Sequence, residues 1–122
     1  KRVNHWQQVA ISASEQCGRV KVPSVTSPVP LPNWVATTAA AERWALHCTD
    51  VGSATAPSPA DSVPSDAALL IGPEGGLTDE EVAIAIEHGF SLLQLGPRIL
   101  RTETAPIVAL TALGIRWREI LN

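Results

Sequence analysis

Cysteine is scarce in this sequence of 122 residues, which contains only Cys17 and Cys48. Two cysteines do not make a disulfide framework, and we expect both to be buried free thiols. The adjacent pair His47 and Cys48 has no second pair of ligands at zinc-binding spacing elsewhere in the chain. A metal site is therefore not expected.

Long apolar runs and excess positive charge are also missing. No run approaches the length of a membrane span, and no charged-then-apolar leader resembles a signal peptide, so we expect a cytoplasmic protein without a membrane partner. The formal net charge of −3 argues against a chain that grips nucleic acid by bulk electrostatics. With 45% hydrophobic and 17% charged residues, the sequence is typical of one globular domain over residues 1–122.

The most informative stretch covers residues 67–105. Its first five residues, AALLI, form an uninterrupted apolar run that predicts a parallel strand buried on both faces. A tight turn follows, in which Gly75 and Gly76 allow positive φ and leave no Cβ in the way of a ligand. Thr78 then resembles a helix N-cap, and Glu81 three residues later completes a capping box. The pattern predicts a strand, a glycine loop and a helix.

The acidic start of this helix bears on the kind of ligand that the loop can bind. Glycine loops at helix N-termini often hold phosphate, but Asp79, Glu80 and Glu81 oppose an anion here. Neither the P-loop pattern nor the dinucleotide fingerprint is present. Two interpretations remain: GPEGG is only a turn between strand and helix, or it contacts a neutral or cationic ligand.

The same order of elements then recurs. The helix closes at residues 87–89, an apolar run covers 90–95, and a second glycine-proline pair ends it. Arg98, Arg101 and Glu103 follow, and a last helix is predicted from Thr104 to Leu121. Two consecutive parallel strands that end in glycine loops bring both loops to the carboxyl edge of one sheet, where open α/β folds bind ligands.

The remaining segments are less regular. Residues 3–17 predict an amphipathic helix that ends at Gly18, with its apolar face formed by Val3, Trp6, Ala10, Ala13 and Cys17. A proline-rich stretch then allows at most a short helix at 33–41, anchored by Trp34, and 43–49 predicts a strand. Residues 50–66 are small and rich in proline, which predicts a mobile surface loop.

The last predicted helix has an apolar surface that is broad for packing on one neighbour. Small residues flank the large ones, and Gly114 is expected to mark a close helix approach. Intramolecular burial explains part of this surface, and a homodimer seam explains the rest. The large apolar positions are Ile107, Leu110, Leu113, Trp117, Ile120 and Leu121.

Three segments carry a family resemblance. IGPEGGLTDEEV, LGPRILRTETAPIVALTAL and ASEQCGR with a following VP resemble the C-terminal half of the ribosomal RNA small-subunit methyltransferase E family. These enzymes are S-adenosylmethionine-dependent uridine-N3 methyltransferases of the SPOUT superfamily. The resemblance implies an α/β parallel-sheet domain with a C-terminal trefoil knot around the cofactor, a dimer, and small-subunit ribosomal RNA as substrate. Because family members are about twice as long, it also implies a truncated domain without the N-terminal RNA-binding barrel.

Catalysis would use charged residues at the start of the last helix. Arg101 can stabilise negative charge on a uracil oxygen, and Glu103 can accept a proton or orient that arginine; a purely structural ion pair is the alternative. Arg19 and Arg98 are candidates for contacting RNA, although Arg19 also suits a solvated helix end. The cofactor is expected against the two glycine loops, at Leu70, Gly72, Pro73, Glu74, Gly75, Gly76, Leu95, Gly96, Ile99 and Leu100.

Other functions remain open at this point. A regulatory or dimerising SPOUT-like scaffold would keep the fold without binding a cofactor. A nucleotide- or phosphate-binding α/β domain would use the GPEGG loop, against the charge of the helix start. A SPOUT methyltransferase could also act on another RNA.

Overall fold

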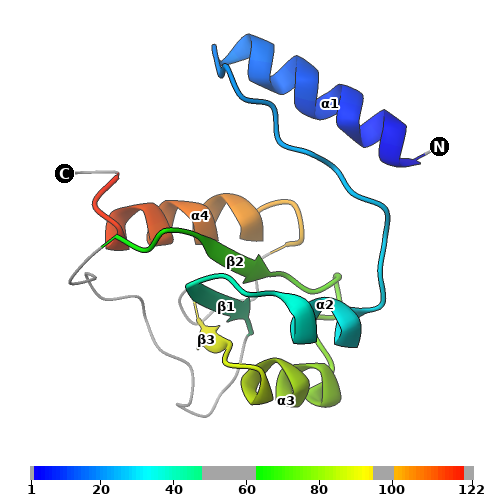
Figure 1. Cartoon of the computed structure of the whole chain (residues 1–122), viewed down its shortest axis with the longest axis vertical. Helices are drawn as coiled ribbons and strands as arrows, with labels where there is room; N and C mark the ends of the chain where they lie inside the picture. Colours follow the sequence, from blue (N-terminus) through cyan, green and yellow to red (C-terminus); the bar gives the residue numbers. More distant parts are fainter. Residues whose placement is uncertain (1, 48–62, 95–100, 120–122) are drawn as a thin grey trace. The chain divides into compact units, whose positions relative to one another are not determined.

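The computed structural model describes residues 2–47, 63–94 and 101–119. The chain divides into two compact units, an N-terminal unit (Lys1–Pro30) and a C-terminal unit (Leu31–Asn122). The N-terminal unit contains helix α1 (Arg2–Gln16). The C-terminal unit contains, in chain order, α2 (Leu31–Thr37), β1 (Glu42–Leu46), β2 (Ala67–Leu70), α3 (Asp79–Glu87), β3 (Ser91–Leu93) and α4 (Ala105–Arg116) (Figure 1).

Helix α1 confirms the prediction of a helix that ends at Gly18. Gly18 has a φ of 74°, and the amides of Gly18 and Arg19 bond back to the carbonyls of Glu15 and Ser14 at 3.3 and 2.8 Å. This pair of bonds is a Schellman motif, which requires a left-handed residue directly after the helix. Glycine adopts that conformation without a Cβ penalty.

The predicted apolar face of α1 is met only in part, because Val3 and Ala10 are half-buried but Trp6, Ala13 and Cys17 are exposed, and the expected burial of the Cys17 thiol is wrong. Trp6 is 47% exposed and Cys17 is a free, exposed thiol, whereas Ser14 is buried. The segment after the helix bonds to Gln7, whose side chain donates to the carbonyl of Pro23 at 2.9 Å and accepts from the amide of Val25 at 2.8 Å. Helical periodicity alone did not reveal that polar bridge. Cys48 lies outside the described residues.

The strands form a parallel sheet in the order β2-β1-β3. Ala45 of β1 pairs with Leu70 on one side and with Leu92 on the other. The parallel α/β fold is therefore confirmed, but β1 is the central strand and β2 lies at an edge of the described sheet. Ala67 is exposed and the rest of β2 is half-buried, so the expected burial on both faces is wrong.

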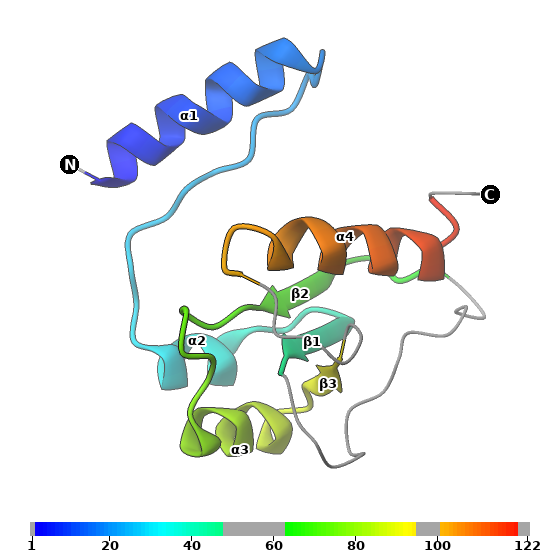
Figure 2. The ribbon, with the colours of Figure 1, turned by 180° about the vertical axis from the view of Figure 1, so that it is seen from behind.

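Helices cover both faces of this sheet (Figures 1 and 2). Helices α2 and α3 lie on one face, where Val35, Ala45 and Phe90 belong to one buried cluster. Trp34 packs against this cluster, with its ring centroid 5.7 Å from that of Phe90, which confirms its anchoring role. Helix α4 lies on the other face. Its cluster contains Trp44, Leu93, Ala109 and Leu113.

Helix α3 begins and ends as predicted. The Thr78 hydroxyl accepts from the Glu81 amide at 3.1 Å, and the Glu81 carboxylate accepts from the Thr78 amide at 2.8 Å. At the other end Gly89 has a φ of 87°, and the Phe90 amide bonds to the carbonyl of Ala85 at 2.9 Å. Strand β3 therefore starts directly after a glycine-capped helix.

Helix α4 is shorter than the sequence predicted. It ends at Arg116, and Arg118 adopts a φ of 60°, which lets the Glu119 amide bond to the carbonyl of Gly114 at 2.8 Å. A helix that ends on a non-glycine residue in the left-handed region carries no sequence signal, so the end at Leu121 was wrong. Its inward side is formed by Ala105, Ala109, Leu113 and Gly114.

Other expectations are met in part. Helix α2 starts at Leu31 with Pro32 in its first turn, which proline tolerates, and β1 lies within the predicted strand region apart from its first residue. Of the predicted mobile loop, 50–62 lie outside the described residues. Asp66 is described, and its carboxylate accepts from the Ala41 amide at 2.8 Å. In the described ranges, none of the helices has the length and apolarity that crossing a membrane requires.

Candidate functional site

The carboxyl ends of the three parallel strands define one edge of the sheet. Leu70, Leu46 and Leu93 end the strands there, and the amide of His47 donates to the carbonyl of Leu93 at 3.1 Å. The glycine loop leaves β2 at this edge. The turn that precedes α4 lies on the same side of the sheet in both views (Figures 1 and 2). The structure thus brings the GPEGG loop and residues 101–104, the described part of the second loop region, to one edge.

The GPEGG loop is a tight turn whose glycines differ in backbone conformation and in steric surroundings. The Gly76 amide donates to the carbonyl of Pro73 at 2.7 Å, and Gly76 has a φ of 78°, as expected. Gly75 does not have a positive φ. A Cβ on Gly72 would lie 2.8 Å from the backbone nitrogen of Leu77, so this glycine permits a close backbone approach. The sequence interpretation stressed Gly75 and overlooked the constraint at Gly72.

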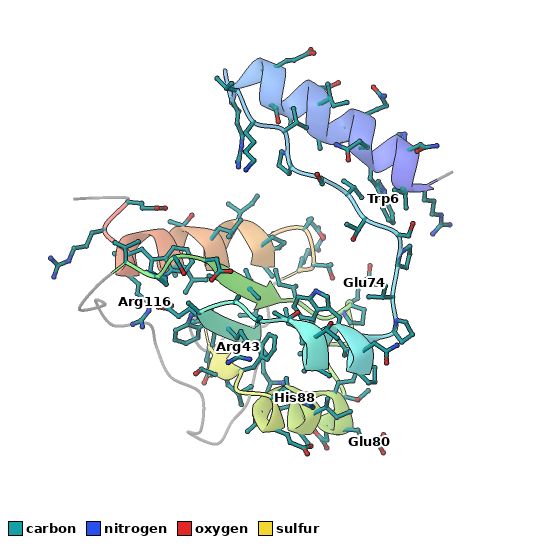
Figure 3. The ribbon with its side chains drawn as sticks, viewed as in Figure 1. Trp6, Arg43, Glu74, Glu80, His88 and Arg116 are labelled. Atoms are coloured by element: carbon teal, nitrogen blue, oxygen red, sulfur yellow. The ribbon has the colours of Figure 1, made fainter. Side chains whose placement is uncertain are left out.

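The outer side of the loop is open. No heavy atom lies within 4 Å of a Cβ built on Gly75 or Gly76. Glu74 lies beyond the end of β2 with its side chain exposed (Figure 3), and Leu77 returns the chain to the core with 8% exposure. The loop is therefore packed closely at Gly72, and its backbone at Gly75 and Gly76 is not covered by neighbouring atoms.

Negative charge dominates this part of the edge. The first turn of α3 contains Asp79, Glu80 and Glu81, and residues 63–94 include no lysine or arginine. This distribution disfavours a polyphosphate and is compatible with a neutral or cationic ligand. In the described part of the chain, no three His, Cys, Asp or Glu side chains gather as metal ligands would.

The predicted catalytic residues lie on a turn that is bonded to α4. The amides of Thr104 and Ala105 donate to the carbonyl of Arg101 at 3.0 and 2.8 Å. The side chains of Arg101 and Glu103 are exposed. Over the ranges that the structure describes, the two form no ion pair with each other. Both side chains are thus exposed to solvent beside this edge.

Other predicted site residues are placed differently. The half-buried side chain of Leu70 packs against the buried cluster beside α2 and α3. Arg19 belongs to the N-terminal unit, where its Nε donates to the carbonyl of Lys21 at 2.8 Å. Five further predicted residues lie outside the described residues: Leu95, Gly96, Arg98, Ile99 and Leu100.

A polar cluster at the opposite edge of the sheet was missed by sequence reasoning. Oε1 of Glu42 accepts from Nε1 of Trp44 at 2.7 Å, from Nε of Arg116 at 3.0 Å and from Nε1 of Trp117 at 3.0 Å. The Arg116 guanidinium also lies 5.3 Å from the centre of the Trp44 ring. We call these four residues the Glu42 cluster.

The surroundings of Glu42 stabilise the charged form of its carboxylate. Burial acts to raise the pKa of Glu42, but the hydrogen bonds from Arg116, Trp44 and Trp117 and the charge of Arg116 outweigh it and lower the pKa below its ordinary value of 4.5. A carboxylate with a lowered pKa stays charged near neutral pH and keeps its hydrogen bonds to Arg116, Trp44 and Trp117. The predicted strand at 43–49 began one residue after Glu42, and no sequence signal joined this part of the chain to α4.

Comparison with known proteins gives a consistent result. A family model described as RNA methyltransferase domain matches residues 1–114. The chain is 37% identical over 123 residues to the ribosomal RNA small subunit methyltransferase E of Buchnera aphidicola subsp. Schizaphis graminum, covering 98% of this chain and 48% of the relative. It is 38% identical over 116 residues to the same-named protein of Synechocystis, covering 93% and 38%.

Two similar solved structures contain a cofactor. A methyltransferase from Legionella pneumophila in complex with SAM is 40% identical, with a TM-score of 0.78 over 93% of this chain and 46% of that one. The ribosomal RNA small subunit methyltransferase E of Neisseria gonorrhoeae, bound to S-adenosyl methionine, is 35% identical, with a TM-score of 0.77 over 95% and 48%. The chain thus spans about half the length of the relatives that it matches.

Proposed function

This chain belongs to the RNA methyltransferase domain family, and we propose that it acts in S-adenosylmethionine-dependent methylation of small-subunit ribosomal RNA at N3 of a uridine. The observation that carries the proposal is the similarity, over nearly the whole chain, to two structures solved with S-adenosylmethionine. The named relatives support the ribosomal substrate. Uridine N3 comes from the motif resemblance.

The GPEGG loop is the proposed cofactor site. Its open side at Gly75 and Gly76 gives a ligand room against the backbone, while Gly72 holds the loop close to Leu77. The acidic start of α3 suits a ligand that carries a sulfonium and an ammonium group. The site would consist of Leu70, Gly72, Pro73, Glu74, Gly75 and Gly76, with Leu95, Gly96, Ile99 and Leu100 from the second loop.

When bound, the cofactor supplies an electrophilic methyl group, and the protein must position a uracil whose N3 has lost its proton. Arg101 is proposed to stabilise negative charge on a uracil oxygen, because its exposed side chain lies on the turn at the same edge. Glu103 is proposed to accept the proton or to orient Arg101. Arg98 and Arg19 are proposed to contact RNA.

Further features of the family belong to the same proposal. We propose that the C-terminal part of the domain forms a trefoil knot, that residues 50–66 are a mobile loop, and that the domain belongs to a longer cytoplasmic enzyme with an N-terminal RNA-binding barrel. A homodimer is supported by exposed apolar residues on α4, where Ile107 is 68% and Leu110 is 57% exposed. The motifs support the knot and the barrel.

The function can be tested by following transfer of a labelled methyl group from S-adenosylmethionine to small-subunit ribosomal RNA. Digestion of the RNA and mass spectrometry of the nucleosides then identify the product. We expect 3-methyluridine. A different methylated nucleoside would support the enzyme class and overturn uridine N3 as the position. A folded chain that neither binds the cofactor nor transfers a methyl group would favour the scaffold.

A further inference from the structure

The side of α4 that packs on the sheet consists mostly of small side chains. Its buried residues include Ala105, Ala109 and Gly114, which are small, and Leu113 is the one large side chain among the buried residues of this helix. Small residues allow a helix to approach a sheet closely, but they interdigitate little and so define the position along the helix axis weakly. Another contact has to set that position.

The Glu42 cluster supplies such a contact at the C-terminal end of α4. One carboxylate oxygen receives three N–H donors, from Trp44 on the same strand and from Arg116 and Trp117 on α4 or directly after it. Hydrogen bonds weaken steeply with distance and angle, so three bonds to one oxygen define a narrow range of positions. Bonds to a charged group are also the stronger ones.

The other end of α4 is tied to the candidate catalytic turn. The carbonyl of Arg101 accepts from the amides of Thr104 and Ala105, and the Val108 amide donates to the carbonyl of Thr104 at 3.1 Å. A movement of α4 along its axis therefore moves the turn that presents Arg101 and Glu103. The helix between the two ends is continuous and about 18 Å long.

From these contacts we propose that Glu42 is a positioning residue, which acts through α4 to hold the Arg101–Thr104 turn in place at the carboxyl edge of the sheet. The effect on catalysis rests on the proposed function, because it assumes that Arg101 and Glu103 contact the substrate. The displacement of the turn does not depend on that function. Arg116, labelled in Figure 3, is the last residue of α4, and the turn directly precedes the first residue of the same helix.

The structural test uses nuclear magnetic resonance of the full chain. Glu42→Gln removes the charge, and Trp117→Phe keeps an aromatic ring while removing one donor. We expect both variants to shift the amide signals of Thr102, Glu103 and Thr104. Unshifted signals in two folded variants would overturn the proposal.

A matched control separates positioning from loss of stability. Phe90→Leu weakens the cluster on the other face of the sheet, where Phe90 is 4% exposed. We expect it to lower the melting temperature and to leave the signals of residues 102–104 where they are. A shift as large as that of Glu42→Gln would mean that any destabilisation disturbs the turn, and would contradict a positioning role.

Kinetics provide a second test, carried out well below the melting temperature. In Glu42→Gln we expect kcat for methyl transfer to fall about tenfold, because small displacements of a catalytic group are costly, while KM for S-adenosylmethionine stays within about twofold. Unchanged kcat would overturn the enzymatic part of the inference. If the parent chain transfers no methyl group, the proposed function fails, and the amide signals still decide whether Glu42 positions the turn.

Discussion

The carboxylate of Glu42 and the guanidinium of Arg116 lie 3.0 Å apart, although 74 residues separate them in the chain. The first residue of the central strand is thereby joined to the last residue of α4. Both side chains are 19% exposed, so the pair is better shielded than an ordinary surface ion pair. One acidic side chain thus binds two distant partners, Arg116 and Trp117, as well as Trp44 on its own strand.

This pair predicts a specific pH dependence of stability. Because the pKa of Glu42 is lower in the folded chain than its ordinary 4.5, the unfolded chain takes up the proton first as the pH falls. The stabilisation is therefore fully present above about 4.5 and is lost as the pH falls through the folded pKa. Thermal unfolding should show a melting-temperature difference between the parent and Glu42→Gln that narrows from pH 6 to pH 3. A constant difference would contradict this origin.

The capping box of α3 should be measurable by itself. Thr78→Ala removes the hydroxyl that accepts from the Glu81 amide, and urea unfolding should show a loss of about 1 kcal/mol. Thr111→Ala is the matched control, because Thr111 is exposed within α4 and its hydroxyl only bonds back to the carbonyl of Ile107. An equal loss in both variants would speak against the cap.

Two glycines in one loop should respond differently to alanine. A methyl group on Gly72 meets the backbone of Gly76 and Leu77 at 2.8–2.9 Å, and Gly72→Ala should cost about 1–3 kcal/mol of unfolding free energy. Gly75→Ala meets no atom within 4 Å and should change stability by less than about 0.5 kcal/mol. Chemical denaturation of the two variants compares them directly. Equal effects would mean that the loop is not held as the structure shows.

Arg101 should matter for rate and not for cofactor affinity. If it stabilises charge on the uracil, Arg101→Ala should lower kcat by about 100-fold and leave cofactor binding unchanged. Arg118→Gly is a suitable control, because it removes another exposed arginine while keeping a φ of 60° favourable. Labelled methyl transfer measures both variants. A similar loss in both would indicate a general need for positive charge.

Local patterns predicted the parts of the fold that depend on neighbouring residues. The capping box at Thr78 and Glu81 and the glycine helix end at Gly89 involve contacts within five residues, and both are as expected. The apolar runs before the two glycine loops also predicted parallel strands. These features follow from backbone hydrogen bonding and φ alone, so sequence contains them directly.

Features that depend on distant partners were not predictable in this way. The prediction that β2 is buried on both faces was wrong, because β1 occupies the centre of the described sheet. The sequence pattern that predicted β1 lies earlier in the chain and is weaker. The exposure of Cys17 depends on where the following chain runs, and the Glu42 cluster depends on a contact across 74 residues. At the candidate site, the sequence identified the glycine loop. It did not show that the steric constraint falls on Gly72 and that Gly75 is unconstrained.

The most direct test of the central claim is calorimetric titration of the folded chain with S-adenosylhomocysteine, with ATP as the control ligand. We predict binding of S-adenosylhomocysteine and none of ATP. Gly75→Val should remain folded, because no atom lies within 4 Å of its Cβ, and should lose more than tenfold in affinity because its side chain fills the open side of the loop. A folded parent chain that binds ATP equally well, or a folded Gly75→Val variant with parental affinity, would contradict a cofactor site at the GPEGG loop.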